Sequence, residues 1–456
     1  MRIHPATLEI APAAAGVSAR LTVPGGKSPT NRALLLAAVA RGRSRLAGLL
    51  DSADTDACAG ALAALGVDID HDPRRGTAAV TGNGGRFPTL SGTIPIGSAG
   101  TVGRFLPGLL AAAPEGDWVL SASPQLSARP LTPLLTALRQ WGAAVEPASE
   151  AGAFPLRVRG GGLRGGALTV SAAESSQFAS GVLLAAPLAA TAATVSARDA
   201  APDESYFDLT LDLMRAFGAV AEEVTASGDA PAGDRVFRVS PGGYRARDYA
   251  VAADANTANY FFALALILGG DIAVANLDPR AATPGIGFLD VLERMGATVE
   301  RRAAEGGVRV SRTGALRGGF TLDLRSLSES APTLAALAYF ADAPVEMRNL
   351  AHIRRHESDR LAALAELLRS LGAGVEEYPD GLRIAPPDPS ARRSAVLDPR
   401  DDHRLAMAMT LVALGARGAT LENPGCVAKT CPDFFDRLRV LTPAAFPNAD
   451  PRGAQP

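Results

Sequence analysis

The chain has 456 residues, and 45 basic residues against 47 acidic ones leave a net charge of −2. This balance excludes a global electrostatic field for nucleic acid or an anionic membrane. Hydrophobic residues make up 47% of the sequence, which excludes a mainly disordered chain. The length predicts two to four domains. Only two of the basic residues, Lys27 and Lys429, are lysines, and the other 43 are arginines.

The cysteines and the chain start bear on location. Cys58, Cys426 and Cys431 form an odd, sparse set, which predicts free thiols in a reducing cytoplasm rather than a disulfide framework or a metal knuckle. Residues 1–16 have no apolar core, unlike a secretory signal. The longest weakly polar stretch, 181–195, is too short to span a bilayer. We therefore expect a cytoplasmic, soluble protein.

One sequence element occurs five times along the chain. It reads LAALGVDID, LRQWGAAVEP, MRAFGAVAEE, LERMGATVER and LRSLGAGVEE, and its glycines are 76 to 78 residues apart: Gly66, Gly142, Gly218, Gly296 and Gly372. Each copy is typical of the last turn of a helix, a glycine that ends it, and the start of a strand. A repeat this regular predicts a fold built from similar units.

A second element alternates with the first and consists of a strand, a loop of small polar residues and an Ala/Leu-rich helix. Its six copies lie at 21–40, 94–112, 168–186, 249–268, 322–340 and 396–414. The helices are apolar on nearly every face, which predicts buried helices. Six α/β units of about 76 residues account for the whole chain. Three units make a domain of ordinary size, so we expect two domains of three units.

The loops of the second element precede helices, and the free N–H groups of a helix N-terminus suit anions. The loop PGGKSPTNR (24–32) contains Lys27, Ser28 and Arg32. It resembles a P-loop superficially, but that motif requires a glycine where Leu21 stands, so we reject a Walker A site. A surface Lys and Arg would be the ordinary interpretation. The rarity of lysine in this chain favours a binding role.

Further loops of this kind carry polar and charged residues: SAGTVGR (98–104), SARP (127–130), SSQF (175–178), IRRHESDR (353–360), RDDHR (400–404) and AKTCPDF (428–434). Taken singly, SSQ is a plain helix cap and a charge run is a solvated face. Taken together, cationic loops in a repeating frame indicate convergence on a small molecule with several negative charges. Because the net charge of the whole chain is −2, such a site must concentrate positive charge locally.

These motifs, in this order over residues 20–440, resemble the 5-enolpyruvylshikimate-3-phosphate synthase family. The resemblance implies a two-domain, inside-out α/β barrel of the enolpyruvyl transferase type, with six βαβαββ units. It also implies that the chain crosses between domains near residues 26 and 247. One domain would be 27–246, the other 1–26 plus 247–456, and the active site would lie in the cleft between them.

The resemblance implies transfer of the enolpyruvyl group of phosphoenolpyruvate to the 5-hydroxyl of shikimate 3-phosphate, with release of phosphate, on the route to chorismate. It implies no cofactor and no metal, and we expect a monomer that binds neither nucleic acid nor membrane. Both substrates carry a carboxylate and a phosphate, which fits several fixed cations. Addition and elimination also need groups that accept and donate protons.

By motif position, the resemblance implies that the catalytic residues are Lys27, Glu329 and Glu357. Glu329 occupies the position of the proton acceptor, and Glu357 that of the proton donor to the methylene carbon. The shikimate-3-phosphate side would comprise Lys27, Ser28, Arg32, Ser175, Ser176, Gln177 and His356. The phosphoenolpyruvate side would comprise Gly100, Arg129, Arg360, Arg404 and Lys429, with Lys27 and Gln177 reaching both substrates.

The chain departs from the family pattern at a few positions. Glu329 and His356 stand where many members have Asp and Lys, although one branch pairs Glu with His. Asp203 replaces the usual substrate-binding serine, and Ser205 or Tyr206 could substitute for it. The closest rival hypothesis is the sister enzyme that uses UDP-N-acetylglucosamine, but it needs a loop cysteine, and Cys58 approaches a helix end. Two more distant hypotheses are a kinase-like nucleotide-binding module and a silent repeat scaffold.

Overall fold

The computed structural model describes residues 5–147, 153–200, 205–224, 234–281, 283–301 and 307–447. The chain forms two compact units. One consists of residues 25–251 and is called the central unit; the other consists of residues 1–24 and 252–456 and is called the terminal unit. The chain therefore passes between units after Pro24 and after Val251. The sequence predicts these crossings near residues 26 and 247.

Three sheets form the strand framework of the central unit, in the orders β14-β3-β5-β4, β6-β7-β9-β8 and β10-β11-β13-β12, with β15 also on β3. The strands are β3 (Ala40–Ala47), β4 (Asp68–Asp72), β5 (Thr77–Asn83), β6 (Ser91–Gly97), β7 (Asp117–Ala122), β8 (Ala144–Pro147), β9 (Leu156–Arg159), β10 (Gly166–Ser171), β11 (Ala193–Arg198), β12 (Ala221–Val224), β13 (Arg235–Val239), β14 (Tyr244–Arg245) and β15 (Tyr249–Ala250). Its helices are α1 (Lys27–Val39), α2 (Ala53–Ala64), α3 (Gly100–Ala111), α4 (Pro124–Ser127), α5 (Thr132–Gln140), α6 (Gln177–Ala185) and α7 (Ser205–Ala216), with the 3₁₀ turn η1 (Ala186–Leu188).

The terminal unit repeats this plan, with sheets ordered β17-β18-β16-β2, β19-β20-β22-β21 and β1-β24-β23. The strands are β1 (Thr7–Ile10), β2 (Val17–Leu21), β16 (Gly270–Val274), β17 (Thr298–Arg301), β18 (Val308–Arg312), β19 (Phe320–Asp323), β20 (Val345–Arg348), β21 (Gly374–Tyr378), β22 (Gly381–Ala385), β23 (Val396–Leu397) and β24 (Ala419–Glu422). The helices are α8 (Ala255–Leu268), α9 (Phe288–Arg294), α10 (Ala331–Ala338), α11 (Arg360–Ser370), α12 (His403–Gly415) and α13 (Phe434–Leu441), and the 3₁₀ turns are η2 (Ser328–Ser330), η3 (Ala351–Arg355), η4 (Pro389–Ala391), η5 (Pro424–Lys429) and η6 (Pro443–Ala445).

The strand pairing explains why the sequence repeats. In the sheet of β6 to β9, β6 and β7 are parallel, whereas β7 with β9 and β8 with β9 are antiparallel. The sheet of β10 to β13 has the same pattern, and so does the sheet of β19 to β22. Among the described residues there are six sheets, one for each predicted unit. The predicted α/β fold of repeated units is confirmed.

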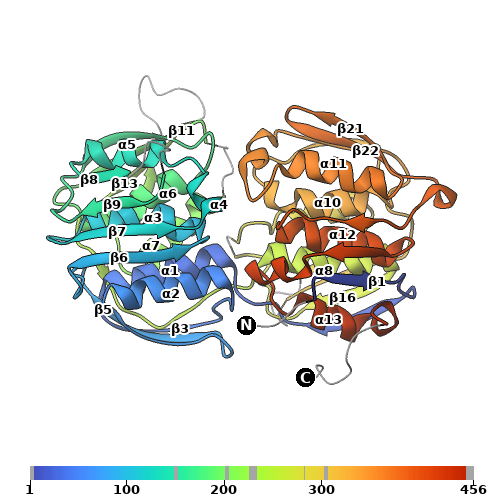
Figure 1. Cartoon of the computed structure of the whole chain (residues 1–456), viewed down its shortest axis with the longest axis horizontal. Helices are drawn as coiled ribbons and strands as arrows, with labels where there is room; N and C mark the ends of the chain where they lie inside the picture. Colours follow the sequence, from blue (N-terminus) through green and yellow to red (C-terminus); the bar gives the residue numbers. More distant parts are fainter. Residues whose placement is uncertain are drawn as a thin grey trace. The chain divides into compact units, whose positions relative to one another are not determined.

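Each unit has its own hydrophobic core, and the helices of the second sequence element are at its centre (Figure 1). Helices α3, α8 and α12 are buried along almost their whole length. Buried Leu, Phe and Val side chains contribute about 1.5–3 kcal/mol each, so these helices supply much of the stability. The prediction of buried helices is confirmed.

The five repeated glycines end helices as the sequence predicts. Their φ angles lie between +81° and +103°, the left-handed region that only glycine adopts at low cost: Gly66, Gly142, Gly218, Gly296 and Gly372. In each case one residue separates the glycine from the last helical residue of α2, α5, α7, α9 or α11, which is the position called C′. The glycine therefore marks the point where the outer helix of each unit turns back into a strand.

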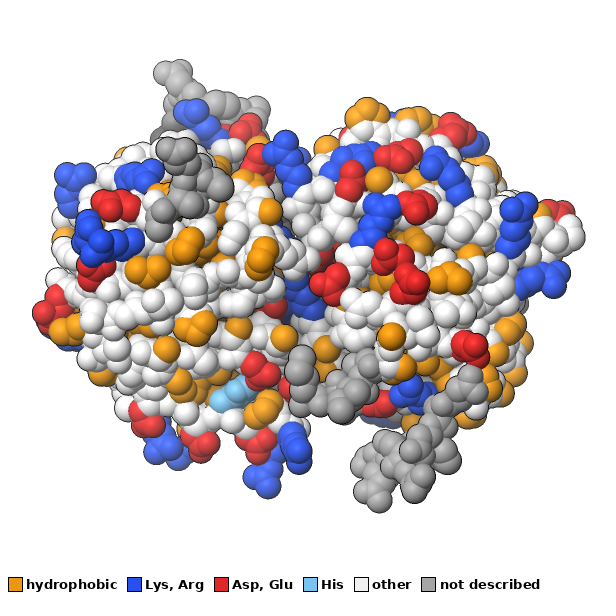
Figure 2. Space-filling model, viewed as in Figure 1, with side chains coloured by type: hydrophobic (Ala, Val, Ile, Leu, Met, Phe, Trp, Pro, Cys, Tyr) orange, Lys and Arg blue, Asp and Glu red, His pale blue; other side chains and the backbone are white. Residues whose placement is uncertain are grey.

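The surface bears charges of both signs. On the face shown in Figure 2, Lys and Arg side chains alternate with Asp and Glu rather than gathering into a single-sign field. This agrees with the net charge of −2. Among the described residues, no helix is both long and apolar enough to cross a membrane.

Candidate functional site

The first predicted loop of the central unit leads directly into α1. Lys27 and Ser28 are the first two residues of that helix and are partly exposed. Gly25 allows the loop to pack closely, because a Cβ there would lie 2.1 Å from the Gly48 carbonyl oxygen. The Lys27 Nζ lies 3.3 Å from Asp54 Oδ2, and this carboxylate is almost buried in the first turn of α2. Asp54 thus fixes the ammonium at a helix N-terminus.

Arg32 lies one turn further along α1 and is fully buried. Its Nε donates to Thr210 Oγ1 at 3.0 Å, its Nη2 to Ser180 Oγ at 3.3 Å and its Nη1 to the Ser28 carbonyl at 3.3 Å. Its guanidinium also lies over the Phe105 ring, 4.5 Å from the centroid. The helices α1, α3, α6 and α7 therefore enclose this arginine, and direct contact with an anion stays a prediction for it.

A second group in the central unit surrounds Gly100, the first residue of α3. A Cβ at Gly100 would lie 3.2 Å from Arg104 Nη1 and 3.5 Å from Arg129 Nη1, so two guanidinium groups converge on this glycine. The Arg104 Nη1 donates to Gln177 Oε1 at 2.9 Å. Because Gly100 has no side chain, the buried N-terminus of α3 lies directly beside two positive charges, an arrangement that suits an anion.

Ser175 and Ser176 precede α6, whose first residue is Gln177. Ser175 Oγ accepts the Gln177 N–H at 3.3 Å, while Ser176 is the N-cap residue and makes no side-chain capping hydrogen bond. Both serines are partly exposed. The α6 N-terminus therefore presents hydroxyl groups and backbone N–H groups next to the Gln177–Arg104 pair.

In the terminal unit, Glu329 lies at the centre of a group of charges. It belongs to the short turn η2, just before α10. Its Oε2 forms an ion pair with Arg404 Nε and lies 3.4 Å from Arg360 Nη1, and its Oε1 lies 3.5 Å from His356 Nδ1. Arg360 is the first residue of α11, and Arg404 is the second residue of α12. Two helix N-termini thus bring cations to one carboxylate.

Glu357 extends the same group. Its Oε2 lies 2.7 Å from Arg360 Nη2, and its Oε1 lies 3.4 Å from Lys429 Nζ at the end of η5. Behind them, the fully buried Asp402 accepts from Arg360 Nε at 2.8 Å and from the Arg404 N–H at 3.0 Å. Asp402 caps α12 and orients Arg360, so one carboxylate fixes the positions of both arginines.

The pKa values follow from these contacts. Burial alone would raise the pKa of Glu329, but the charges of Arg404, Arg360 and His356 hold it well below its usual range. Burial lowers the pKa of His352 to about 3, assisted by the charges of His356 and Arg325. The His352 ring packs edge-on against the His356 ring at 5.6 Å between centroids. At neutral pH Glu329 is therefore ionised and His352 is neutral.

The structure brings the predicted residues of the terminal unit together, and some of those of the central unit. In the terminal unit all six form one group: Glu329, His356, Glu357, Arg360, Arg404 and Lys429. In the central unit, Gly100, Arg129 and Gln177 converge around Arg104, while Lys27 and Ser28 start α1. Asp203 lies outside the described residues.

Sequence reasoning missed three supporting residues. Asp54 and Asp402 hold predicted cations, and Arg104 bridges Gly100 to Gln177. Arg104 and Asp402 stand inside motifs that the sequence singles out, so their place next to predicted ligands is the signal that could have found them. Asp54 has no such signal, because only folding brings α2 next to Lys27.

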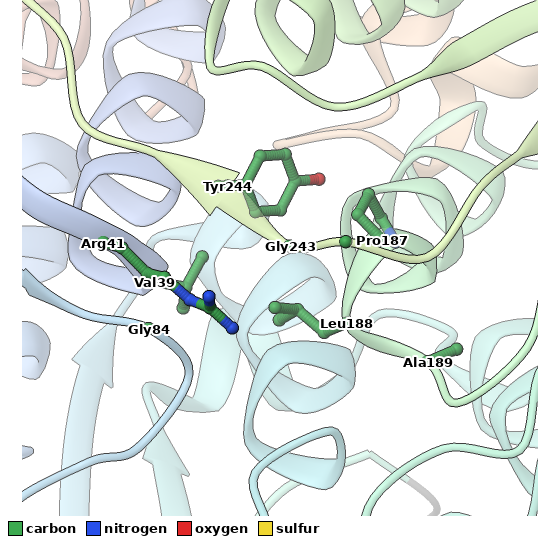
Figure 3. Close-up of a pocket in the computed structure, with 9 residues that line it drawn as sticks. Val39, Arg41, Gly84, Pro187, Leu188, Ala189, Gly243 and Tyr244 are labelled. Atoms are coloured by element: carbon green, nitrogen blue, oxygen red, sulfur yellow. The ribbon is translucent and has the colours of Figure 1, made fainter.

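A cavity of about 230 Å³ in the central unit is not part of these groups. Its lining includes Val39, Arg41, Leu188 and Tyr244, and none of the predicted site residues. Arg41 extends from β3 toward Leu188, below the strand that carries Tyr244 (Figure 3). The candidate site is therefore assigned from the charged side chains at helix N-termini and not from this cavity.

Comparison with known proteins now adds independent evidence. Residues 13–438 match the family model described as EPSP synthase (3-phosphoshikimate 1-carboxyvinyltransferase). The chain belongs to the EPSP synthase family. It is 40% identical over 435 residues to 3-phosphoshikimate 1-carboxyvinyltransferase 2 of Halalkalibacterium halodurans, covering 95% of this chain and 94% of that one. It is also 40% identical over 432 residues to the 3-phosphoshikimate 1-carboxyvinyltransferase of Pectobacterium carotovorum, covering 94% and 97%.

Solved structures agree with this membership of the EPSP synthase family. The EPSP synthase of Acinetobacter baumannii matches with a TM-score of 0.79 and 25% identity, covering 96% of this chain and 98% of that chain. The enolpyruvyl transferase NikO of Streptomyces tendae matches with a TM-score of 0.74 and 20% identity, covering 95% and 97%, which shows the fold alone. The fold is the α/β fold of enolpyruvyl transferases, as the sequence predicts.

The burial of the cysteines tests the rival hypothesis of an enzyme that uses UDP-N-acetylglucosamine, because that enzyme needs a loop cysteine. Cys58 lies inside α2, is fully buried, and burial raises the pKa of its thiol. Cys426 is partly buried, and burial raises its pKa to about 12. A buried, protonated thiol is a poor nucleophile. The structure thus offers no support for a reaction through Cys58.

Proposed function

We propose that the two groups of residues described above bind the substrates and carry the proton transfers of the family reaction. The chain is a 3-phosphoshikimate 1-carboxyvinyltransferase, which transfers the enolpyruvyl group of phosphoenolpyruvate to shikimate 3-phosphate in aromatic amino acid biosynthesis. The observation that supports these residues most is the terminal-unit group, in which Arg360, Arg404 and Lys429 surround Glu329 and Glu357.

Charge complementarity supports the assignment of the cations. Each substrate brings a carboxylate and a phosphate, and arginine binds both groups through paired N–H donors. We assign Arg129, Arg360, Arg404 and Lys429 to phosphoenolpyruvate, with Gly100 leaving room for it. We assign Ser28, Arg32, Ser175, Ser176 and His356 to shikimate 3-phosphate, and Lys27 and Gln177 to both substrates.

We assign the proton transfers to Glu329 and Glu357. The 5-hydroxyl oxygen of shikimate 3-phosphate bonds to C2 of phosphoenolpyruvate as its proton passes to Glu329. The methylene carbon takes a proton from Glu357, which gives a tetrahedral intermediate. In the second step the bond from C2 to the phosphate oxygen breaks, the methyl carbon returns a proton to Glu357, and phosphate departs with the proton that Glu329 held. Lys27 and the arginines stabilise the leaving phosphate.

Substrate binding also adjusts the basicity of Glu329. In the structure its carboxylate is held by Arg404 and Arg360, which lowers its pKa and makes it a weak base. A substrate phosphate or carboxylate that binds these arginines adds negative charge next to Glu329. A nearby negative charge raises the pKa of a carboxyl group. The bound substrate would therefore make Glu329 a stronger proton acceptor at the moment it is needed.

Phosphate release tests the activity. We expect release only when shikimate 3-phosphate and phosphoenolpyruvate are both present, and none when either is omitted. The assignment of residues is tested by Arg404→Lys, because an ammonium cannot form the paired hydrogen bonds of a guanidinium. We expect its KM for phosphoenolpyruvate to rise by roughly 10-fold or more, with a smaller change for shikimate 3-phosphate. An unchanged KM would remove Arg404 from the phosphoenolpyruvate side.

Location and assembly remain predictions. The sparse, unpaired cysteines favour the cytoplasm. We expect a monomer because each of the two units has a hydrophobic core of its own. Light scattering of the purified protein would test the monomer directly.

A further inference from the structure

Glu329 stands on a structural element that is too short to fix its own position. The turn η2 has three residues, and its backbone hydrogen bonds include the Ser330 N–H to the Leu327 carbonyl at 2.8 Å and the Ala331 N–H to the Ser328 carbonyl, just before α10. A single 3₁₀ turn has few internal hydrogen bonds, so outside contacts must hold it. The backbone position of Glu329 therefore depends on the contacts of the neighbouring Ser330, while Arg404, Arg360 and His356 hold its carboxylate.

Two asparagines of α8 provide that anchor. Ser330 Oγ donates to Asn256 Oδ1 at 3.0 Å and accepts from Asn259 Nδ2 at 3.4 Å. All three side chains are almost completely buried. The same asparagines donate to the carbonyls of Pro284 and Gly285, each at 3.1 Å. The loop before α9 and the turn that carries Glu329 are thus fastened to one helix.

The same helix also reaches the partner of Glu329. Tyr260 follows Asn259 on α8, and its hydroxyl donates to the Arg404 carbonyl at 3.4 Å. Arg404 is the arginine whose Nε pairs with Glu329 Oε2. Helix α8 therefore holds both members of the ion pair, the glutamate through Ser330 and the arginine through its backbone.

We propose that Ser330, Asn256 and Asn259 are positioning residues, which hold the Glu329 carboxylate in place for proton transfer. Their buried hydrogen bonds join the turn η2 to α8, a helix buried along almost its whole length. Small displacements of a reacting group are costly, and a shift of about 1 Å can lower a rate by roughly 100-fold. This inference rests on the proposed role of Glu329 as the proton acceptor.

The test uses Ser330→Ala in the full-length protein, with Ser328→Ala as the matched control. Ser328 belongs to the same turn and is only partly buried, so it undergoes the same chemical change outside the buried anchor. We expect kcat to fall roughly 10-fold in Ser330→Ala, with KM for both substrates within about 2-fold of wild type. Ser328→Ala should keep the wild-type kcat. Equal losses in the two variants would overturn the proposal.

A double-mutant cycle separates positioning from general damage. If Ser330 acts through Glu329, Ser330→Ala should lower the residual kcat of Glu329→Gln by less than about 2-fold. A roughly 10-fold loss in both backgrounds would indicate a structural defect and overturn the proposal. A wild-type kcat in Glu329→Gln itself would instead overturn the proposed role of Glu329. A low kcat in Glu329→Gln with a normal kcat in Ser330→Ala would overturn the positioning role alone.

Discussion

The two units use the same plan of repeats but surround the fully buried arginines Arg32 and Arg360 in different ways. In the central unit, Arg32 is fully buried among the hydroxyls of Thr210 and Ser180, the Ser28 carbonyl and the Phe105 ring. In the terminal unit, Arg360 is fully buried among three carboxylates, those of Asp402, Glu329 and Glu357. Both arginines lie near the start of a helix that follows a predicted loop.

We propose that this difference lets one repeated unit serve two chemical tasks. Hydroxyls and carbonyls orient a guanidinium through hydrogen bonds to uncharged groups, which suits stable binding of an anion. Carboxylates cancel the charge and are themselves proton carriers, which suits proton transfer. An anion that approaches the terminal unit must compete with Glu329 and Glu357 for the cations, and this competition couples binding to the basicity of the glutamates.

The largest effect should come from Lys27→Arg. A guanidinium is bulkier and planar and cannot take the place of the ammonium beside Asp54 at the α1 N-terminus. We expect kcat to fall by roughly 100-fold or more while the circular dichroism spectrum stays unchanged. The reverse exchange at an exposed site, Arg41→Lys, is the matched control and should keep full activity. Near-normal turnover in Lys27→Arg would contradict the role of the rare lysines.

A smaller effect on stability should follow from Asp402→Asn in the terminal unit. The substitution removes a buried negative charge from Arg360 and leaves its guanidinium under-compensated. Breaking a buried ion pair destabilises a protein by about 3 kcal/mol. Urea unfolding followed by fluorescence would measure the loss. A change below about 0.5 kcal/mol would mean that the carboxylates of Glu329 and Glu357 suffice for Arg360.

The corresponding change in the central unit, Thr210→Val, should cost less. It keeps the shape of the side chain and removes the hydroxyl that accepts from Arg32 Nε, bonds to Ser180 Oγ and donates to the Tyr206 carbonyl of its own helix, a local bond that adds little stability. Each of the two bonds between helices contributes about 1 kcal/mol. Thr210→Ser retains the hydroxyl and is the control. If Thr210→Val destabilised the protein as much as Asp402→Asn, the distinction between neutral and ionic support would fail.

The smallest effect concerns His352, whose ring should not gain a proton as the pH falls through the usual histidine range. Because burial lowers its pKa to about 3, the folded protein binds fewer protons at this ring than the unfolded chain, whose histidine has a pKa of about 6.5. Its contribution to stability is therefore complete above about pH 6.5 and is lost as the pH falls toward about 3. Proton NMR should show unshifted His352 ring signals between about pH 8 and pH 5. A midpoint near the ordinary histidine pKa would contradict the buried, neutral ring.

Much of the fold could be predicted because each repeated unit has recognisable sequence features. The glycines at Gly66 and its four counterparts predict where outer helices end, and the apolar helices predict the cores. The motifs also predict the residues that converge in the terminal unit. The partners could not be predicted, because contacts such as Asp54 with Lys27 and Asn256 with Ser330 join residues far apart in sequence. The burial of Arg32 likewise depends on four helices meeting.

The choice of acceptor is the most direct test of the proposed function. A single reaction with phosphoenolpyruvate, shikimate 3-phosphate and UDP-N-acetylglucosamine, followed by phosphorus NMR, reports which acceptor is consumed. We expect shikimate 3-phosphate to disappear as inorganic phosphate and an enolpyruvyl product form, while UDP-N-acetylglucosamine stays unchanged. Consumption of UDP-N-acetylglucosamine with shikimate 3-phosphate untouched would contradict the proposed function.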